Sequence, residues 1–213
     1  MVFWMKIKQQ IGDYISKHAT YFIVAIVMLV MGIVFGALAV RILNPGQRSE
    51  LWQYLATFFD SMDNRETVAA PILLRNSLTG HFRTLALITV LGLSVIGSPL
   101  ILLFLFTRGF IIGFSVGFLV EQMVFKGILL SMVAVLPQNL LIVPALLLAS
   151  VACLDFSIIL VRGRLKNRSL GRFHDLMATG AAVLASGIIL ILASLIESYI
   201  SPAFLSLFGR WLI

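Results

Sequence analysis

The sequence has little charge and almost no cysteine, and both shortages limit the class of protein. Only 12% of its 213 residues are Asp, Glu, Lys or Arg, while 60% are hydrophobic and the mean hydropathy is +1.05. A water-soluble domain of this length cannot bury so much apolar surface. The single cysteine, Cys153, excludes a disulfide framework and a cysteine-based metal site. We therefore expect an integral membrane protein with a buried thiol.

Acidic residues are also scarce, and the formal net charge is +7 from 16 Lys and Arg against nine Asp and Glu. In a soluble protein this excess would suggest a nucleic-acid partner, but beside membrane spans it is typical of the positive-inside rule. The segment 162–174 has five basic residues and no acid, so we place it in the cytoplasm. The amino terminus is then expected inside and the polar segment 41–83 outside, with membrane lipid around the spans.

Long uncharged runs predict an all-α, polytopic membrane protein with about five transmembrane helices. A helix of about 20 apolar residues crosses the hydrocarbon core. The expected spans are 21–40, 84–107, 109–125, 144–161 and 176–196. Arg108 is expected in a tight turn between the second and third spans. Five crossings would place the carboxyl terminus outside.

The domain organisation is expected to be simple: a cytoplasmic juxtamembrane segment at 1–20 and one polytopic domain over 21–213, with an extracytoplasmic insertion at 41–83. Apolar residues of the first segment recur at helical spacing among lysines, which is typical of a helix on the membrane surface. Ala37-Leu38-Ala39 resembles a signal-peptidase site, but the long polar lead-in favours a retained span.

The insertion 41–83 contains an amphipathic helix. Its apolar stripe has helical spacing and consists of Leu51, Tyr54, Leu55, Phe58, Phe59 and Met62. Most such faces pack on the protein's own spans or on lipid. The alternative is a docking face for a partner protein, to which the three aromatic side chains are suited.

A long apolar run near the middle of the chain carries an unexpected group of polar and proline residues. The 35 residues of 127–161 would make about 52 Å of helix, too long for one straight span. Pro144 suits the first turn of a returning helix. We therefore expect 127–143 to be a bent or re-entrant piece that breaks at Pro137-Gln138-Asn139, where the two amides satisfy orphaned carbonyls.

Residues 113–117 match the G-x-S-x-G pattern of a nucleophile elbow, but that elbow needs a strand-to-helix turn and a histidine within reach. An apolar helical run provides neither, so we predict no catalytic residue, no enzyme activity, no cofactor and no metal. A better reading is close helix packing, because small residues four apart share one face. The residues concerned are Gly32, Gly36, Gly109, Gly113 and Gly117. Such faces serve packing within one chain more often than a homo-oligomer interface, which stays open.

Several motifs together resemble the stage II sporulation protein M family over essentially the whole chain. They are MGIVFGA (31–37), LLRNSL (73–78), GLSVIGSP (92–99), RGFIIGFSVGFLVEQM (108–123), VLPQNLLIVPALL (135–147) and ESYISPAF (197–204). The two long motifs at 108–123 and 135–147 are the most specific.

The resemblance implies a non-enzymatic, multi-pass membrane scaffold of endospore-forming bacteria. It implies two peptidoglycan-cleaving partners, the stage II sporulation proteins D and P, which thin the septal wall while the forespore is engulfed. It also implies a location at the sporulation septum and the engulfing mother-cell membrane.

A small transporter or channel is the alternative function. It would use the broken helix at 137–144, with Asp155 as a coupling group, because a carboxylate inside a span is often functional. Asp155 can also be explained as a snorkelling partner of Arg162, two helical turns further on. A water-accessible cavity that joins Gln138, Asn139 and Asp155 would favour transport, and a packed interior would favour the scaffold.

Overall fold

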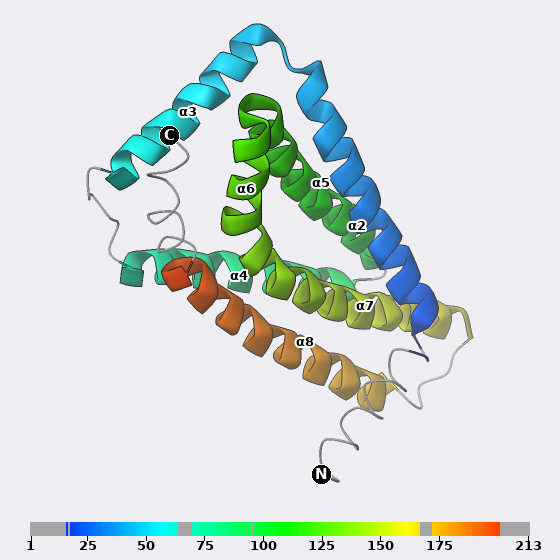
Figure 1. The fold of residues 1–213 in the computed structure, drawn as a ribbon. Coiled ribbons are helices and arrows are strands. Elements are labelled where there is room, and N and C mark those ends of the chain that lie inside the picture. Colours follow the sequence, from blue (N-terminus) through cyan, green and yellow to red (C-terminus); the bar gives the residue numbers. More distant parts are fainter. Residues whose placement is uncertain (1–15, 17, 64–69, 95, 167–171, 201–213) are drawn as a thin grey trace.

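The computed structural model describes residues 16, 18–63, 70–94, 96–166 and 172–200, and the elements within these ranges are all helical (Figure 1). The elements are α2 (Ala19–Ala39), the 3-10 turn η1 (Val40–Ile42), α3 (Pro45–Asp63), α4 (Ala70–Gly92), α5 (Gly97–Met123), α6 (Phe125–Ala134), α7 (Leu136–Lys166), α8 (Arg172–Leu195) and the π-helical turn η2 (Ile196–Ile200). Nearly all of the predicted juxtamembrane segment 1–20 lies outside the described residues.

The prediction of an all-helical, polytopic membrane protein is confirmed. By length and composition, four helical segments of the described chain can cross a membrane, and they are 19–42, 97–123, 136–161 and 176–199. The predicted number was about five. The difference arises on either side of Arg108. The sequence suggested two spans there, and the structure has one helix that is long and apolar enough to cross a membrane.

The predicted turn at Arg108 is wrong, because α5 continues through this residue from Gly97 to Met123. The chain breaks earlier, between the end of α4 at Gly92 and the start of α5. Pro99 lies in the first turn of α5, where its missing N–H would have no intrahelical partner. A single arginine among good helix formers does not end a helix, whereas a Gly-Ser-Pro sequence readily starts a new one.

The predicted break at Pro137-Gln138-Asn139 lies instead a few residues earlier. The chain turns at Val124, between α5 and α6, and bends again at Val135, between α6 and α7. Pro137 occupies the first turn of α7, and Pro144 lies inside that helix. The side-chain amide of Asn139 donates a 2.7 Å hydrogen bond to the Val135 carbonyl, so it does satisfy a carbonyl at the junction. The re-entrant form predicted for 127–143 is not confirmed.

The helices have defined relative directions. Leu29 contacts Gly109, and Ile33 contacts Gly113. Residue numbers therefore increase in the same direction along α2 and α5, so the two helices run parallel. α4 runs parallel to α7, with Gly92 against Cys153 and Ser94 bonded to Ser157. It runs antiparallel to α8, since Glu197 contacts His81 and Gly187 contacts Leu85. The largest buried apolar cluster lies among α4, α5, α7 and α8 and includes Ile88, Ile101, Ala145, Leu146, Ala149, Cys153 and Leu190.

Val124 adopts a backbone conformation that favours glycine, with φ of 48° and ψ of −113°. This region is costly for a β-branched residue, by about 1–2 kcal/mol. We therefore expect Val124→Gly to raise the free energy of unfolding by about 1 kcal/mol, measured by thermal unfolding in detergent. Val135→Gly is the control, because Val135 has φ of −103° and gains nothing from glycine. Equal effects of the two changes would contradict this account of the turn.

Candidate functional site

The glycines of α2 face the backbone of α5 with no side chain between them. A Cβ atom placed on Gly32 would overlap the carbonyl oxygen of Phe106, and one placed on Gly36 would overlap that of Phe110. Both glycines are buried, although most of α2 is exposed. Lipid provides no hydrophobic driving force for helix association, so van der Waals contact at this short range stabilises the pair.

The glycines of α5 make the reciprocal contacts with α2. A Cβ on Gly109 would overlap the Leu29 carbonyl oxygen, and one on Gly113 would overlap that of Ile33. At Gly117 the added atom would lie 3.1 Å from the Cα of Ala37. The structure therefore brings all five predicted packing glycines into one contact, here called the glycine seam. Helices this close also form Cα–H···O contacts between their backbones.

Ser115 of the G-x-S-x-G pattern lies inside α5, so these residues lack the strand-to-helix turn of a nucleophile elbow. The part of the chain that the structure describes contains no group of three or more His, Cys, Asp or Glu side chains that could hold a metal ion. The seam is thus a packing feature of the membrane domain.

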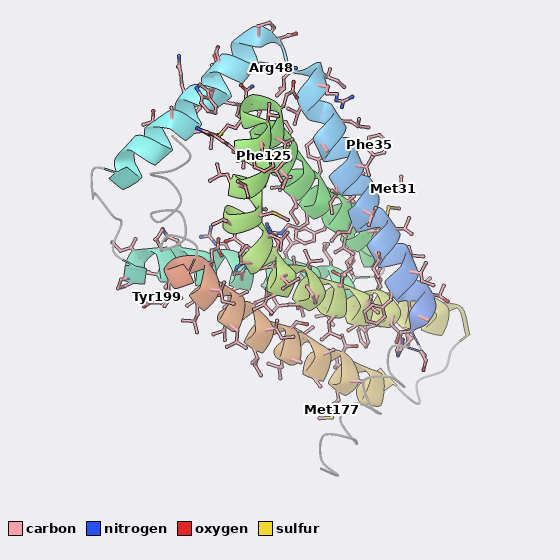
Figure 2. All side chains as sticks on the ribbon, viewed as in Figure 1. Met31, Phe35, Arg48, Phe125, Met177 and Tyr199 are labelled. Carbon is pink, nitrogen blue, oxygen red and sulfur yellow. The ribbon has the colours of Figure 1, made fainter. Side chains whose placement is uncertain are left out.

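Arg48 joins three segments at the far end of the seam (Figure 2). Its Nη1 lies 2.7 Å from a carboxylate oxygen of Glu121, near the end of α5. Its Nε and Nη2 donate to the carbonyls of Leu43, Val40 and Arg41, at 3.2, 3.4 and 3.3 Å. Those carbonyls follow the end of α2, where a positive charge is favourable. We call this set of contacts the Arg48 clamp; it fixes where α3 begins relative to α2 and α5.

The predicted docking stripe on α3 divides in two. Leu51 and Leu55 are half-buried, and Leu55 packs against the buried cluster that contains Leu119. Tyr54 is 78% exposed, and its neighbour Trp52 is exposed as well. The side chains of Phe58, Phe59 and Met62 lie outside what the structure describes. The Leu51 and Leu55 side of the stripe therefore packs on the protein itself, while Tyr54 and Trp52, on opposite flanks of that side, remain exposed.

A second group of residues forms a polar cluster that the sequence analysis missed. Glu197, in the π-helical turn after α8, accepts a 2.5 Å hydrogen bond from the hydroxyl of Ser77. The same carboxylate oxygen lies 3.2 Å from Nε2 of His81, whose side chain is 8% exposed. Ser77 and His81 are one helical turn apart on α4 and therefore share one face.

Arg108 of α5 adds a cationic side chain to this cluster. Its guanidinium and the Glu197 carboxylate attract each other electrostatically. Several buried atoms here have no hydrogen-bond partner among the described residues, namely Nδ1 of His81, Nε of Arg108 and Oγ of Ser198. A partly satisfied network of ionisable groups at the edge of an apolar interior is unusual, and in a membrane protein it marks a functional or structural site.

The sequence did contain a signal for this cluster. Ser77 and His81 are four residues apart in a helix, and Arg108 interrupts an otherwise apolar run. Arg108 is expected in a turn, and Glu197 directly follows the expected span 176–196. Each residue was interpreted alone, and only the packing of α4 against α8 shows that they meet.

Asp155 is near the opposite end of the bundle. One of its carboxylate oxygens lies 3.6 Å from Nδ1 of His18, just before α2. The expected partner was Arg162, whose side chain lies outside the described residues. The contact joins the end of α7 to the start of α2.

Two cavities open along α5, and both are mainly apolar. A cavity of about 610 Å³ lies between α2 and α5, with Arg41 and Glu121 among its lining residues. Another of about 520 Å³ lies among α5, α6 and α7 and includes Asn139. Neither lining includes Gln138 or Asp155. The described cavities therefore do not join the polar residues that a transport path through the broken helix would use.

Comparison with known proteins gives one match. The sequence profile of a family described as stage II sporulation protein M matches residues 25–202. No curated protein and no solved structure matches the chain.

The glycine seam leads to a prediction about stability. Gly113→Ala should lower the free energy of unfolding by about 1–3 kcal/mol, because the new methyl group would push the two backbones apart. Gly180→Ala on α8 is a matched control, since a Cβ there meets nothing within 4 Å; it should be neutral or stabilising by up to about 1 kcal/mol. Thermal unfolding in detergent measures both. A Gly113→Ala variant as stable as the original protein would contradict the close contact.

Proposed function

Because this chain belongs to the stage II sporulation protein M family, we propose that it is a non-enzymatic membrane scaffold that recruits peptidoglycan-degrading enzymes. Family membership implies a role in sporulation, and the four apolar helices make the chain a membrane protein. The proposed partners are the stage II sporulation proteins D and P. The proposed site of action is the sporulation septum and the engulfing mother-cell membrane, where the enzymes would thin the septal wall.

The observation that carries the scaffold proposal is the placement of α3. This helix lies outside the four apolar segments and is held at the end of the seam by the Arg48 clamp. Its exposed side chains include Trp52 and Tyr54, which are residue types typical of interface hot spots. A helix held in a fixed position, with an exposed aromatic residue on each flank of its packed side, suits a docking role.

The proposed orientation puts this helix on the side of the membrane where wall enzymes act. Basic residues concentrate in 162–174, which favours a cytoplasmic position for the link between α7 and α8. The start of α2 lies next to the end of α7, through His18 and Asp155, and therefore belongs on the same side. α2 then runs outward and delivers α3 to the outer surface. The transporter alternative has no comparable support, because the described cavities do not join Asn139 to Asp155.

The docking role can be tested by replacing the exposed aromatic residues of α3. We expect the double variant Trp52→Ser, Tyr54→Ser to lose at least one of the two enzymes in co-purification from sporulating-cell membranes, because truncating hot-spot aromatics typically costs about 2 kcal/mol or more each. Tyr199→Ser is the control, since Tyr199 is also an exposed aromatic residue but lies after α8 (Figure 2). Retention of both enzymes by a double variant that accumulates normally would overturn docking at α3.

The position of α3 should matter as much as its side chains. Arg48→Ala removes the ion pair and three carbonyl contacts while leaving every proposed docking residue in place. We expect it to reduce recovery of the same enzyme that the aromatic variant loses. Arg41→Ala serves as the control, because Arg41 is an exposed arginine in the same region that contributes only its carbonyl to the clamp. Equal recovery with Arg48→Ala and Arg41→Ala would show that the clamp does not position the docking helix.

A further inference from the structure

We propose that Glu197 is an intramembrane counter-charge that holds α4 across the membrane as a fifth crossing. The composition of α4 does not identify it as a span, and it is absent from the four segments that satisfy length and hydropathy. Three independent features of the described residues support the crossing: the direction of α5, the depth of the ends of α4, and the contacts of His81.

The parallel direction of α2 and α5 requires a return of the chain between them. Both segments are long and apolar enough to cross, and the glycine seam pairs them with numbers rising together. A chain that crosses outward in α2 and outward again in α5 must come back between residues 43 and 96. α3 is held at the outer end by the Arg48 clamp, so α4 is the remaining described helix that can provide the return.

Two polar contacts place the second half of α4 between opposite ends of two apolar segments. In its first half and at its middle, Ser77 and His81 meet Glu197, which is close to the end of the apolar segment 176–199. Beyond its other end, the Ser94 carbonyl accepts a 2.9 Å hydrogen bond from Ser157, near the end of the segment 136–161. The helix between these contacts covers roughly 20–25 Å at 1.5 Å per residue, most of the hydrocarbon thickness.

Polar side chains explain why this crossing needs help from α8. Arg75 and Arg83 are exposed, and long arginine side chains can reach toward the membrane surface. His81 cannot do so, because it is buried and faces α8. Placing an unpaired imidazole in an apolar interior is costly, and the Glu197 carboxylate supplies its partner. The same carboxylate attracts Arg108 on α5, so one acidic group serves two basic ones.

The site is suited to holding α4 against the end of α8 by a polar contact. The carboxylate lies in a π-helical turn, a rare feature that often occurs at functional positions. His81 is buried, while the Glu197 side chain is 36% exposed. Replacing both polar partners by apolar groups can be nearly neutral, but removing Glu197 alone leaves a buried imidazole without this partner, which is destabilising. That asymmetry gives the proposal a distinctive test: a single substitution should be harmful, and a second should rescue it.

The first test asks on which side of the membrane the end of α4 lies. It uses single cysteines in a Cys153→Ala background. A cysteine at Leu93, just after α4, should react with an impermeant thiol reagent in inside-out vesicles and stay unlabelled in intact cells. A cysteine at Ser49 should behave in the opposite way. Labelling of both positions from the same side would overturn the fifth crossing, whether or not the enzymes are recruited.

The counter-charge is tested by cross-linking α4 to α8 with a bifunctional thiol reagent through cysteines at Leu85 and Gly187. A Cβ on Gly187 lies 3.4 Å from the Leu85 side chain, so the pair should react readily. We expect Glu197→Leu to lower the cross-linked fraction at least about tenfold, because it leaves His81 unpaired. The double variant His81→Leu, Glu197→Leu should recover most of it.

A control pair at Phe35 and Phe106, whose rings contact across the seam with centroids 6.0 Å apart, reports whether α2 and α5 still associate. Cross-linking there should be unchanged in all variants. If Glu197→Leu fails to accumulate, the double variant should accumulate again. An unaffected single variant, or a double variant no better than the single one in yield or accumulation, would overturn the counter-charge role.

Discussion

The backbone contact between α2 and α5 is the constraint on which the rest of the structure depends. In lipid, two apolar helices gain little from hiding apolar surface, so their association relies on how closely they approach. Glycines on both helices permit backbone contact and fix one register. That register places Glu121 beside Arg48, and the parallel direction sets the topology of everything between the two helices. The seam thus determines where α3 begins relative to α5 and how the two helices are aligned.

Charged residues are few in this chain, and those that the structure describes inside the bundle join separate elements. Arg48 and Glu121 connect α3 to α5, His18 and Asp155 connect the start of α2 to α7, and the Glu197 cluster connects α4 to the end of α8. Apolar contacts in a bilayer specify partners weakly, whereas a polar group has few acceptable positions. Beside the glycine seam, polar pairs therefore help to set which helices meet, and the apolar clusters fill the space between them.

Helical class, membrane location and the glycine faces could be predicted from the sequence, because each depends on local composition or on spacing within one helix. The turn at Arg108 was wrong for the same reason: a charge in an apolar run was interpreted as an end, although a partner on another helix can accommodate it. Pro137 and Pro144 were likewise assigned a break that belongs to Val124 and Val135. Single members of the cluster around Glu197 stand out in the sequence, but their contact could not be predicted, because it joins residues 116 and 120 positions apart in the chain.

The Arg48 clamp also makes α3 a mechanical extension of the membrane domain. One guanidinium holds main-chain carbonyls at the end of α2 and a carboxylate on α5, so a pull on α3 acts on both helices at once. The seam resists sliding, because moving either helix by one residue brings a side chain against the partner's backbone. Load on α3 is therefore passed to two interlocked helices and not to a single loop.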